Sequence, residues 1–172
     1  MQAGSIEKRI QELYTINKAL LLKIFDVFDA SDELKGRRSM ERKLLEEAKR
    51  EFAYSISLRQ RIHRNPELSF EEYETAALIK EELERMGVAW ESVTETGIVA
   101  TICGNVPPCR GKGKTIALRA DMDALSITEL TDVPFHSEVQ GKMHACGHDL
   151  HVAMLLTAAK LLQQHRDQFC GT

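Results

Sequence analysis

The residues with the clearest capacity for chemistry lie in the ten-residue stretch 142–151. Three His, one Cys and one Asp stand close together there: His144, Cys146, His148, Asp149 and His151. The stretch therefore holds half of the six His in the chain. Imidazole, thiolate and carboxylate groups are the usual protein ligands of zinc and similar divalent ions. An apolar run typical of a helix follows at 152–162, so we interpret the stretch as metal ligands at the start of a helix.

Two further carboxylates, Asp121 and Asp123, follow a run at 114–119 that has the composition of a strand. In α/β folds, ligand sites gather beyond the carboxyl ends of the strands, so we expect these acids to approach the 142–151 stretch. Carboxylates, imidazoles and a thiolate can together hold two divalent ions, which activate a water and polarise a carbonyl group.

Each of these residues also has an interpretation without chemistry. Asp121 and Asp123 could cap a turn, and Cys146 could be a small buried apolar residue. Asp149 is either the N-cap of the following helix or a support for a ligand. His151 either orients a ligand or simply packs, because it lies one turn after His148.

Three other His receive a structural interpretation. His63 comes just before Asn65 and Pro66, which end a helix, so we expect a structural role at that helix end. We expect His136 and His165 to be ordinary surface or loop residues.

The order of helical and strand patterns predicts an α/β fold, a partial catalytic domain with a central sheet of about three strands flanked by helices. An extra helix is expected at the N-terminus, from an N-cap at Ser5. The helices are expected over residues 5–29, 39–64, 69–86 and 149–166. The strands are expected over residues 88–93, 97–103 and 114–119, with an irregular segment over 126–143.

Composition limits the functional classes. The 172 residues carry a net charge of −3, which does not favour nucleic acid or an anionic membrane as a partner. Apolar runs are too short to span a bilayer, and the N-terminus does not resemble an export signal. Four scattered Cys are typical of thiols in a reducing compartment, so we expect a cytoplasmic protein.

Three segments together resemble a known family, in the same order along the chain. They are Arg61–Ser69, Leu118–Leu125 and Gly141–Asp149. These segments are similar to successive motifs of the metal-dependent amidohydrolases in the aminoacylase and metallocarboxypeptidase superfamily. That branch includes hippurate hydrolases, N-acyl-amino-acid amidohydrolases and auxin-conjugate hydrolases. The similarity extends from about residue 45 to the end of the sequence.

The resemblance implies an α/β catalytic domain with two divalent ions, usually zinc, manganese or cobalt. It places Cys146 and His148 as metal ligands and Asp123 as an acid beside the metals, our candidate catalytic residue. Asp121 takes a position that is His in other branches. The implied reaction is hydrolysis of the amide bond in a small N-acyl amino acid, or of a bond at a peptide C-terminus.

The sequence departs from the family pattern at both ends. Residues 1–40 have no counterpart, and Ser126 replaces a usual proline. The sequence stops before the family's Glu pair, which supplies the general base, and before its lid domain. We therefore expect two parts, an N-terminal helix and linker (1–38) and a truncated catalytic domain (39–172), with little activity alone. The alternative is a non-catalytic interaction protein that pairs through the 5–29 helix, with a partner or with a second copy as a homo-oligomer.

Overall fold

The computed structural model describes residues 34–107 and 113–172 of the chain, and side chains from residue 42 onward. The helix predicted over 5–29 lies outside these ranges. The described elements, in chain order, are α2 (Leu34–Arg50), α3 (Phe52–Arg64), α4 (Tyr73–Met86), β1 (Ala89–Ser92), β2 (Ile98–Thr101), α5 (His148–Gln164) and the short 3-10 helix η1 (Arg166–Gln168).

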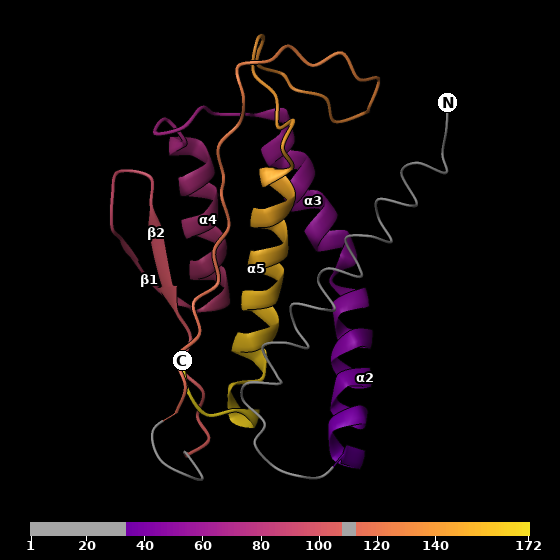
Figure 1. Ribbon diagram of the computed structural model, residues 1–172, viewed down its shortest axis with the longest axis vertical. Helices are drawn as coiled ribbons and strands as arrows, with labels where there is room; N and C mark the ends of the chain where they lie inside the picture. The colour runs from indigo at the N-terminus through magenta and orange to yellow at the C-terminus, as the bar shows by residue number, and fades with distance from the viewer. Residues whose placement is uncertain (1–33, 108–112) are drawn as a thin grey trace.

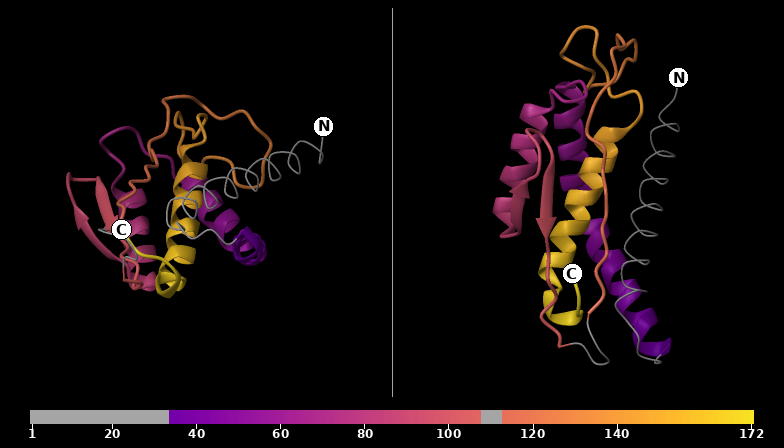
Figure 2. Two further views of the ribbon diagram at one scale, coloured as in Figure 1. Left: turned by 60° about the horizontal axis from the view of Figure 1, so that its bottom comes forward. Right: turned by 60° about the vertical axis from the view of Figure 1, so that its left-hand side comes forward.

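The helix α5 is central to the fold, because it packs against both α3 and α4 (Figure 1). A small sheet lies beside α4, and further views of the same arrangement are given in Figure 2. The main core consists of buried apolar residues from these helices and one residue after α4: Leu58, Ile62, Leu78, Leu83, Val88, Val152, Ala153 and Leu156. Burial of these side chains holds α5 against its neighbours. The predicted α/β class is confirmed.

The helices α2 and α3 replace the single helix predicted over 39–64. They meet at Glu51, whose N–H donates to the Glu47 carbonyl at 3.2 Å and whose carbonyl accepts from the Ser55 N–H at 3.0 Å. Helical hydrogen bonding thus continues through the junction. The helix α2 begins at Leu34, so part of the predicted linker is helical. Within the two described ranges, no helix is both long and apolar enough to cross a membrane.

The helix α4 begins four residues after the predicted start at Ser69. Its first turn is capped by Glu67, whose carboxylate accepts from the N–H of Glu74 at 3.0 Å and of Thr75 at 2.8 Å. A carboxylate suits this position because it pairs with free N–H groups and with the positive end of the helix dipole. Glu67, and not the residue at the predicted helix start, therefore caps α4.

The sheet has two strands in the described part of the chain, not the expected three. The strands are antiparallel, and the paired residues are Ala89 with Thr101, Trp90 with Ala100, Glu91 with Val99, and Ser92 with Ile98. Residues 114–119 form no strand. Their backbone instead makes two hydrogen bonds with Thr172, one through Lys114 and one through Ile116, each 2.9 Å long. Two hydrogen bonds to one residue are too few to form a strand ladder.

The 126–143 loop is irregular, as predicted, and its two ends are joined. Leu125 and Met143 exchange two backbone hydrogen bonds of 3.0 Å. The loop lies at the upper end of the molecule in Figure 1, where α5 begins. Gly147 is the N-cap of α5 and has φ of 86°, a left-handed conformation that glycine adopts at least cost. The loop therefore lies next to the start of α5.

Candidate metal centre

The first turn of α5 brings together three side chains that can hold a metal ion: Asp121, His148 and His151. Their ligand atoms all lie within 4.8 Å of one another, and this is the one such group found among the described residues. Asp121 and His148 are half-buried, whereas His151 is exposed. The rings of His148 and His151 stack with their centroids 5.4 Å apart. The geometry thus brings Asp121 and His151 to the predicted ligand His148.

Asp123 determines which nitrogen of His148 can bind a metal. The Nδ1 atom of His148 lies 2.8 Å from Asp123 Oδ1 and 3.0 Å from the Asp123 carbonyl oxygen. Both oxygens are acceptors, so Nδ1 carries the proton and Nε2 keeps a lone pair. A carboxylate that orients a His in this way is the usual support of a metal-binding imidazole. The predicted neighbourhood of Asp123 and His148 is therefore present.

Ser69 also belongs to this site, although the sequence pattern placed it only at a helix start. Its hydroxyl donates to Asp123 Oδ2 at 2.6 Å. This hydrogen bond, together with that from His148, holds the pKa of Asp123 below its usual range. Asp123 is therefore ionised at neutral pH and accepts from both partners. Position 69 could have been recognised only from its place in the first family-like segment.

Asp121 forms an exposed ion pair with Arg119. The Arg119 guanidinium donates to Asp121 Oδ1 at 2.6 Å, and 87% of the Arg119 side chain is exposed. Exposed ion pairs contribute little free energy, because water competes for both partners. Breaking this ion pair when a metal ion binds Asp121 would therefore cost little free energy. One carboxylate and two imidazoles form a donor set that fits zinc and related divalent ions.

Cys146 and His144 lie on the same segment but outside the group of three. Cys146 is a free thiol and is exposed, so it is not the buried apolar residue considered above. His144 is buried, and neither ring nitrogen has a hydrogen-bond partner in the described part of the chain. Burial lowers the pKa of His144, which keeps its ring neutral.

Asp149 is not the N-cap of α5, because Gly147 has that position. Its side chain is fully buried, and its Oδ2 atom accepts from His63 Nδ1 at 2.8 Å and from Arg59 Nε at 3.1 Å. Burial alone would raise the pKa of Asp149, but the His63 hydrogen bond and the Arg59 charge outweigh it and lower the pKa. Asp149 is therefore a buried carboxylate that joins α5 to α3.

The remaining His predictions have different outcomes. His136 is exposed in the 126–143 loop, as predicted. His165 is buried in the turn that follows α5, so it is a loop residue, as one of the two alternatives predicted, but not a surface residue. Its ring contacts the Glu47 carboxylate of α2 through Nε2 and the Gln168 amide through Nδ1. Glu47 is more than 100 positions away along the sequence, so no local pattern could indicate this burial.

Known sequences similar to this chain are peptidases and amidohydrolases, the class that the three family-like segments resemble. Residues 117–172 match the profile of Peptidase family M20/M25/M40. The chain is 48% identical over 129 residues to an IAA-amino acid hydrolase of Arabidopsis thaliana. This alignment covers 73% of this chain and 28% of the relative. Thermostable carboxypeptidase 2 of Saccharolobus solfataricus is 51% identical over 67% of this chain and 29% of its own length. N-acetyl-L-cysteine deacetylase of Bacillus subtilis is 46% identical over 67% of this chain and 27% of its own length.

Solved structures agree with the sequence comparison. A dinuclear metal-binding M20 peptidase from Bacillus subtilis superposes with a TM-score of 0.63 at 44% identity, over 69% of this chain and 33% of that one. A structure described as an aminohydrolase from methicillin-resistant Staphylococcus aureus superposes with a TM-score of 0.70 at 43% sequence identity. The superposition covers 76% of this chain and 34% of that chain. The fold and the matched segments correspond to part of an α/β domain of the kind found in M20 peptidases. The chain is related to the M20 peptidases and amidohydrolases, which confirms the resemblance, and it spans roughly a third of the length of these solved relatives.

Proposed function

We propose that the chain provides metal ligands for the hydrolysis of an amide bond in an N-acyl amino acid or at a peptide C-terminus. The relatives support this substrate class. Their names describe a hydrolase of an amino acid conjugate, a carboxypeptidase and a deacetylase of an N-acetylated amino acid. Each of these names describes cleavage of a bond between an acyl group and an amino acid.

The observation that carries the proposal is the orientation of His148. Its Nδ1 atom is held by Asp123, which leaves Nε2 for a metal, and its ligand atom is near those of Asp121 and His151. A bound divalent ion lowers the pKa of a coordinated water and polarises an amide carbonyl. In this proposal His148, Asp121 and His151 hold an ion, Asp123 and Ser69 keep His148 in the binding tautomer, and Cys146 is a further ligand on the basis of the family resemblance.

The proposal includes two ions per site, zinc, manganese or cobalt, because one solved relative is a dinuclear metal-binding peptidase. It also includes a reducing, cytoplasmic location, to which the free thiols of Cys103, Cys146 and Cys170 are suited. We propose a small-molecule or peptide substrate as the partner, and neither nucleic acid nor membrane.

Cobalt titration of the 172-residue chain tests the proposal. We expect saturable Co²⁺ binding with the visible absorption of a protein-bound ion, and loss of that binding in His148→Ala. The exposed loop residue His136 supplies the control, since His136→Ala should bind like the wild type. A thiolate-to-cobalt charge-transfer band that disappears in Cys146→Ala would add Cys146 to the ligands.

Hydrolysis of N-acetyl amino acids is the second readout. With Zn²⁺, Mn²⁺ or Co²⁺ present, we expect the chain alone to accelerate hydrolysis only slightly beyond the metal ion, in line with the little activity expected from its sequence, and His148→Ala to remove the difference. Absence of stoichiometric metal binding in the wild type would contradict the proposed function.

A further inference from the structure

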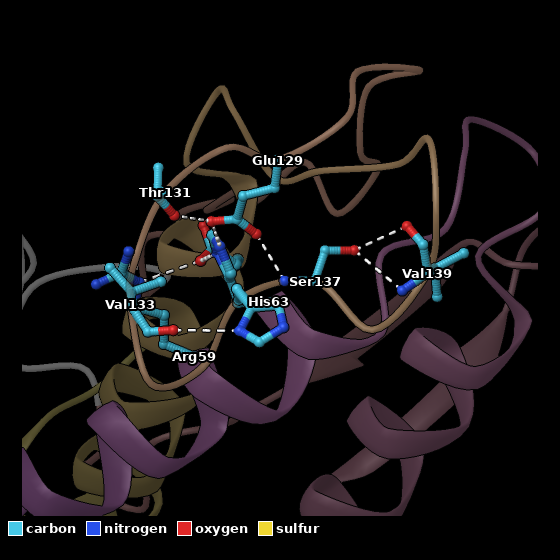
Figure 3. Close-up of polar contacts among 9 residues, drawn as sticks. Arg59, His63, Glu129, Thr131, Val133, Ser137 and Val139 are labelled. Atoms are coloured by element: carbon cyan, nitrogen blue, oxygen red, sulfur yellow. Dashed lines mark hydrogen bonds and ion pairs between the residues drawn. The ribbon is translucent and has the colours of Figure 1, made fainter.

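The 126–143 loop is folded around a buried carboxylate, that of Glu129 (Figure 3). Glu129 accepts a hydrogen bond from the Thr131 hydroxyl and another from the Ser137 N–H, the latter at 2.6 Å. Only 4% of its side chain is exposed, and its Oε1 atom lies 3.2 Å from Nε2 of His63. The Glu129 side chain thus attaches the loop to α3.

The other nitrogen of His63 faces a second carboxylate, that of Asp149 in α5. The Nδ1 atom lies 2.8 Å from Asp149 Oδ2. An ionised carboxylate has no hydrogen to donate, so each of the two contacts requires an N–H on the ring. A neutral imidazole has one N–H, whereas an imidazolium has two. The geometry therefore corresponds to a doubly protonated His63.

The charges around His63 are balanced. Arg59 from α3 donates to the same Asp149 oxygen at 3.1 Å, so two cations face the carboxylates of Glu129 and Asp149. The ring of His144, from the segment before α5, lies 6.2 Å away between centroids. Burial is the largest influence and lowers the pKa of His63, but the hydrogen bonds and charges of the two carboxylates together outweigh it and raise the pKa.

Phe135 provides a second attachment of the loop at the same place. Its ring lies edge-on to the ring of His63 at 5.4 Å, and the Arg59 guanidinium lies over it at 5.1 Å from the centroid. The Glu129 carboxylate and the Phe135 ring thus add to the contacts that Arg64, the last residue of α3, makes with Pro134 and Glu138 of the loop.

We propose that His63, as an imidazolium that bridges Glu129 and Asp149, is a positioning residue that holds the 126–143 loop and the first turn of α5 in one arrangement. Asp149 directly follows the candidate ligand His148, so the same contact supports the metal centre. This last step rests on the proposed function, whereas attachment of the loop does not.

The direction of the pH dependence follows from the raised pKa of His63. Its contribution to stability is complete below the pKa of His in the unfolded chain, about 6.5. The contribution is lost as the pH rises through the higher pKa of the folded state, because the ring then has one N–H for two acceptors. We therefore expect the loop to loosen at alkaline pH.

Hydrogen exchange of the full chain tests the attachment of the loop. Protection factors of amides in 126–143, which correct for the intrinsic pH dependence of exchange, should fall from neutral to alkaline pH in the wild type. In Glu129→Gln the amide can donate to a neutral Nε2, so the fall should disappear or move to lower pH. Asp132→Asn changes an exposed acid of the same loop and should keep the wild-type profile.

Cobalt affinity tests the support of the metal centre. We expect His63→Gln to weaken Co²⁺ binding by about tenfold, the effect typical of a lost residue behind a metal ligand. His136→Gln, in the exposed loop position, should leave the affinity unchanged. If His63→Gln does not fold, the Glu129→Gln exchange profile still decides the question.

Two results would overturn the inference: a wild-type exchange profile that does not change with pH, or the same profile in Glu129→Gln and the wild type. Absence of cobalt binding by the wild type would instead contradict the proposed function, and the exchange measurement would remain valid.

Discussion

Asp123 illustrates what can and cannot be inferred about a single residue from its position in the sequence. An Asp-x-Asp pattern after a predicted strand fits a turn cap as well as a metal support. In the folded chain both carboxylate oxygens have partners, His148 on one and Ser69 on the other. Ser69 is 54 positions away, so only tertiary contact distinguishes the two interpretations.

Replacing Asp123 should weaken metal binding without removing a ligand. In Asp123→Asn the amide can donate as well as accept, so His148 is no longer held in one tautomer. We expect the Co²⁺ affinity to fall by about 10-fold to 100-fold. Asp132→Asn, at an exposed position in the 126–143 loop, is the matched control. An unchanged affinity in Asp123→Asn would show that His148 does not depend on this carboxylate.

At the scale of elements, the predicted ends of α3 and α4 are confirmed, whereas the predicted start of α4 was wrong by four residues. Pro66 stops α3 and Gly87 closes α4, because each acts through its own backbone. The start of α4 is capped by Glu67, which lies seven positions before the Glu74 N–H that it accepts. Such a cap depends on the path of the intervening chain, which local patterns do not reveal.

Gly87 gives a test at this scale. It has φ of 66°, and an added Cβ would lie 3.9 Å from the Gln163 side chain, an ordinary contact. The cost of Gly87→Ala is therefore conformational, and we expect a loss of about 1 kcal/mol in the free energy of unfolding. Urea unfolding measures it. Glu84→Ala, at an exposed position of α4, should change stability by less than about 0.5 kcal/mol. Equal losses in both variants would contradict the conformational explanation.

At the scale of the whole molecule, stability depends on how α5 is buried. Leu156 on this helix is 4% exposed and belongs to the main core. Leu156→Ala removes buried methyl groups and leaves a cavity, so we expect a loss of about 2–5 kcal/mol. That is a large part of the roughly 5–15 kcal/mol that holds an ordinary domain folded. Urea unfolding should show a clearly lower midpoint.

The matched control is Leu130→Ala, because Leu130 is 92% exposed in the 126–143 loop. We expect its midpoint to remain close to that of the wild type. Similar midpoints for Leu156→Ala and Leu130→Ala would mean that α5 does not form the centre of the core.

Local patterns in the sequence were enough to predict most of the helices. Short-range features include the helical periodicity of α3, α4 and α5, the residues that stop helices, and the His-rich stretch 142–151. Each of the three family-like segments is also one short continuous stretch of sequence. The prediction of a third strand was wrong because a strand also needs a partner strand. In the described part of the chain, residues 114–119 make only two backbone hydrogen bonds with another segment.

Which side chains meet depends on how the helices and loops pack together. His63 contacts Asp149 across 86 positions and Glu129 across 66, and His148 contacts Asp123 across 25. The surroundings then shift the two pKa values in opposite directions: the carboxylates on both sides raise the pKa of His63 against the effect of burial, while desolvation lowers the pKa of His144. Contacts of this range and the charges that they stabilise arise from packing of the helices, for which no short segment of sequence contains a signal.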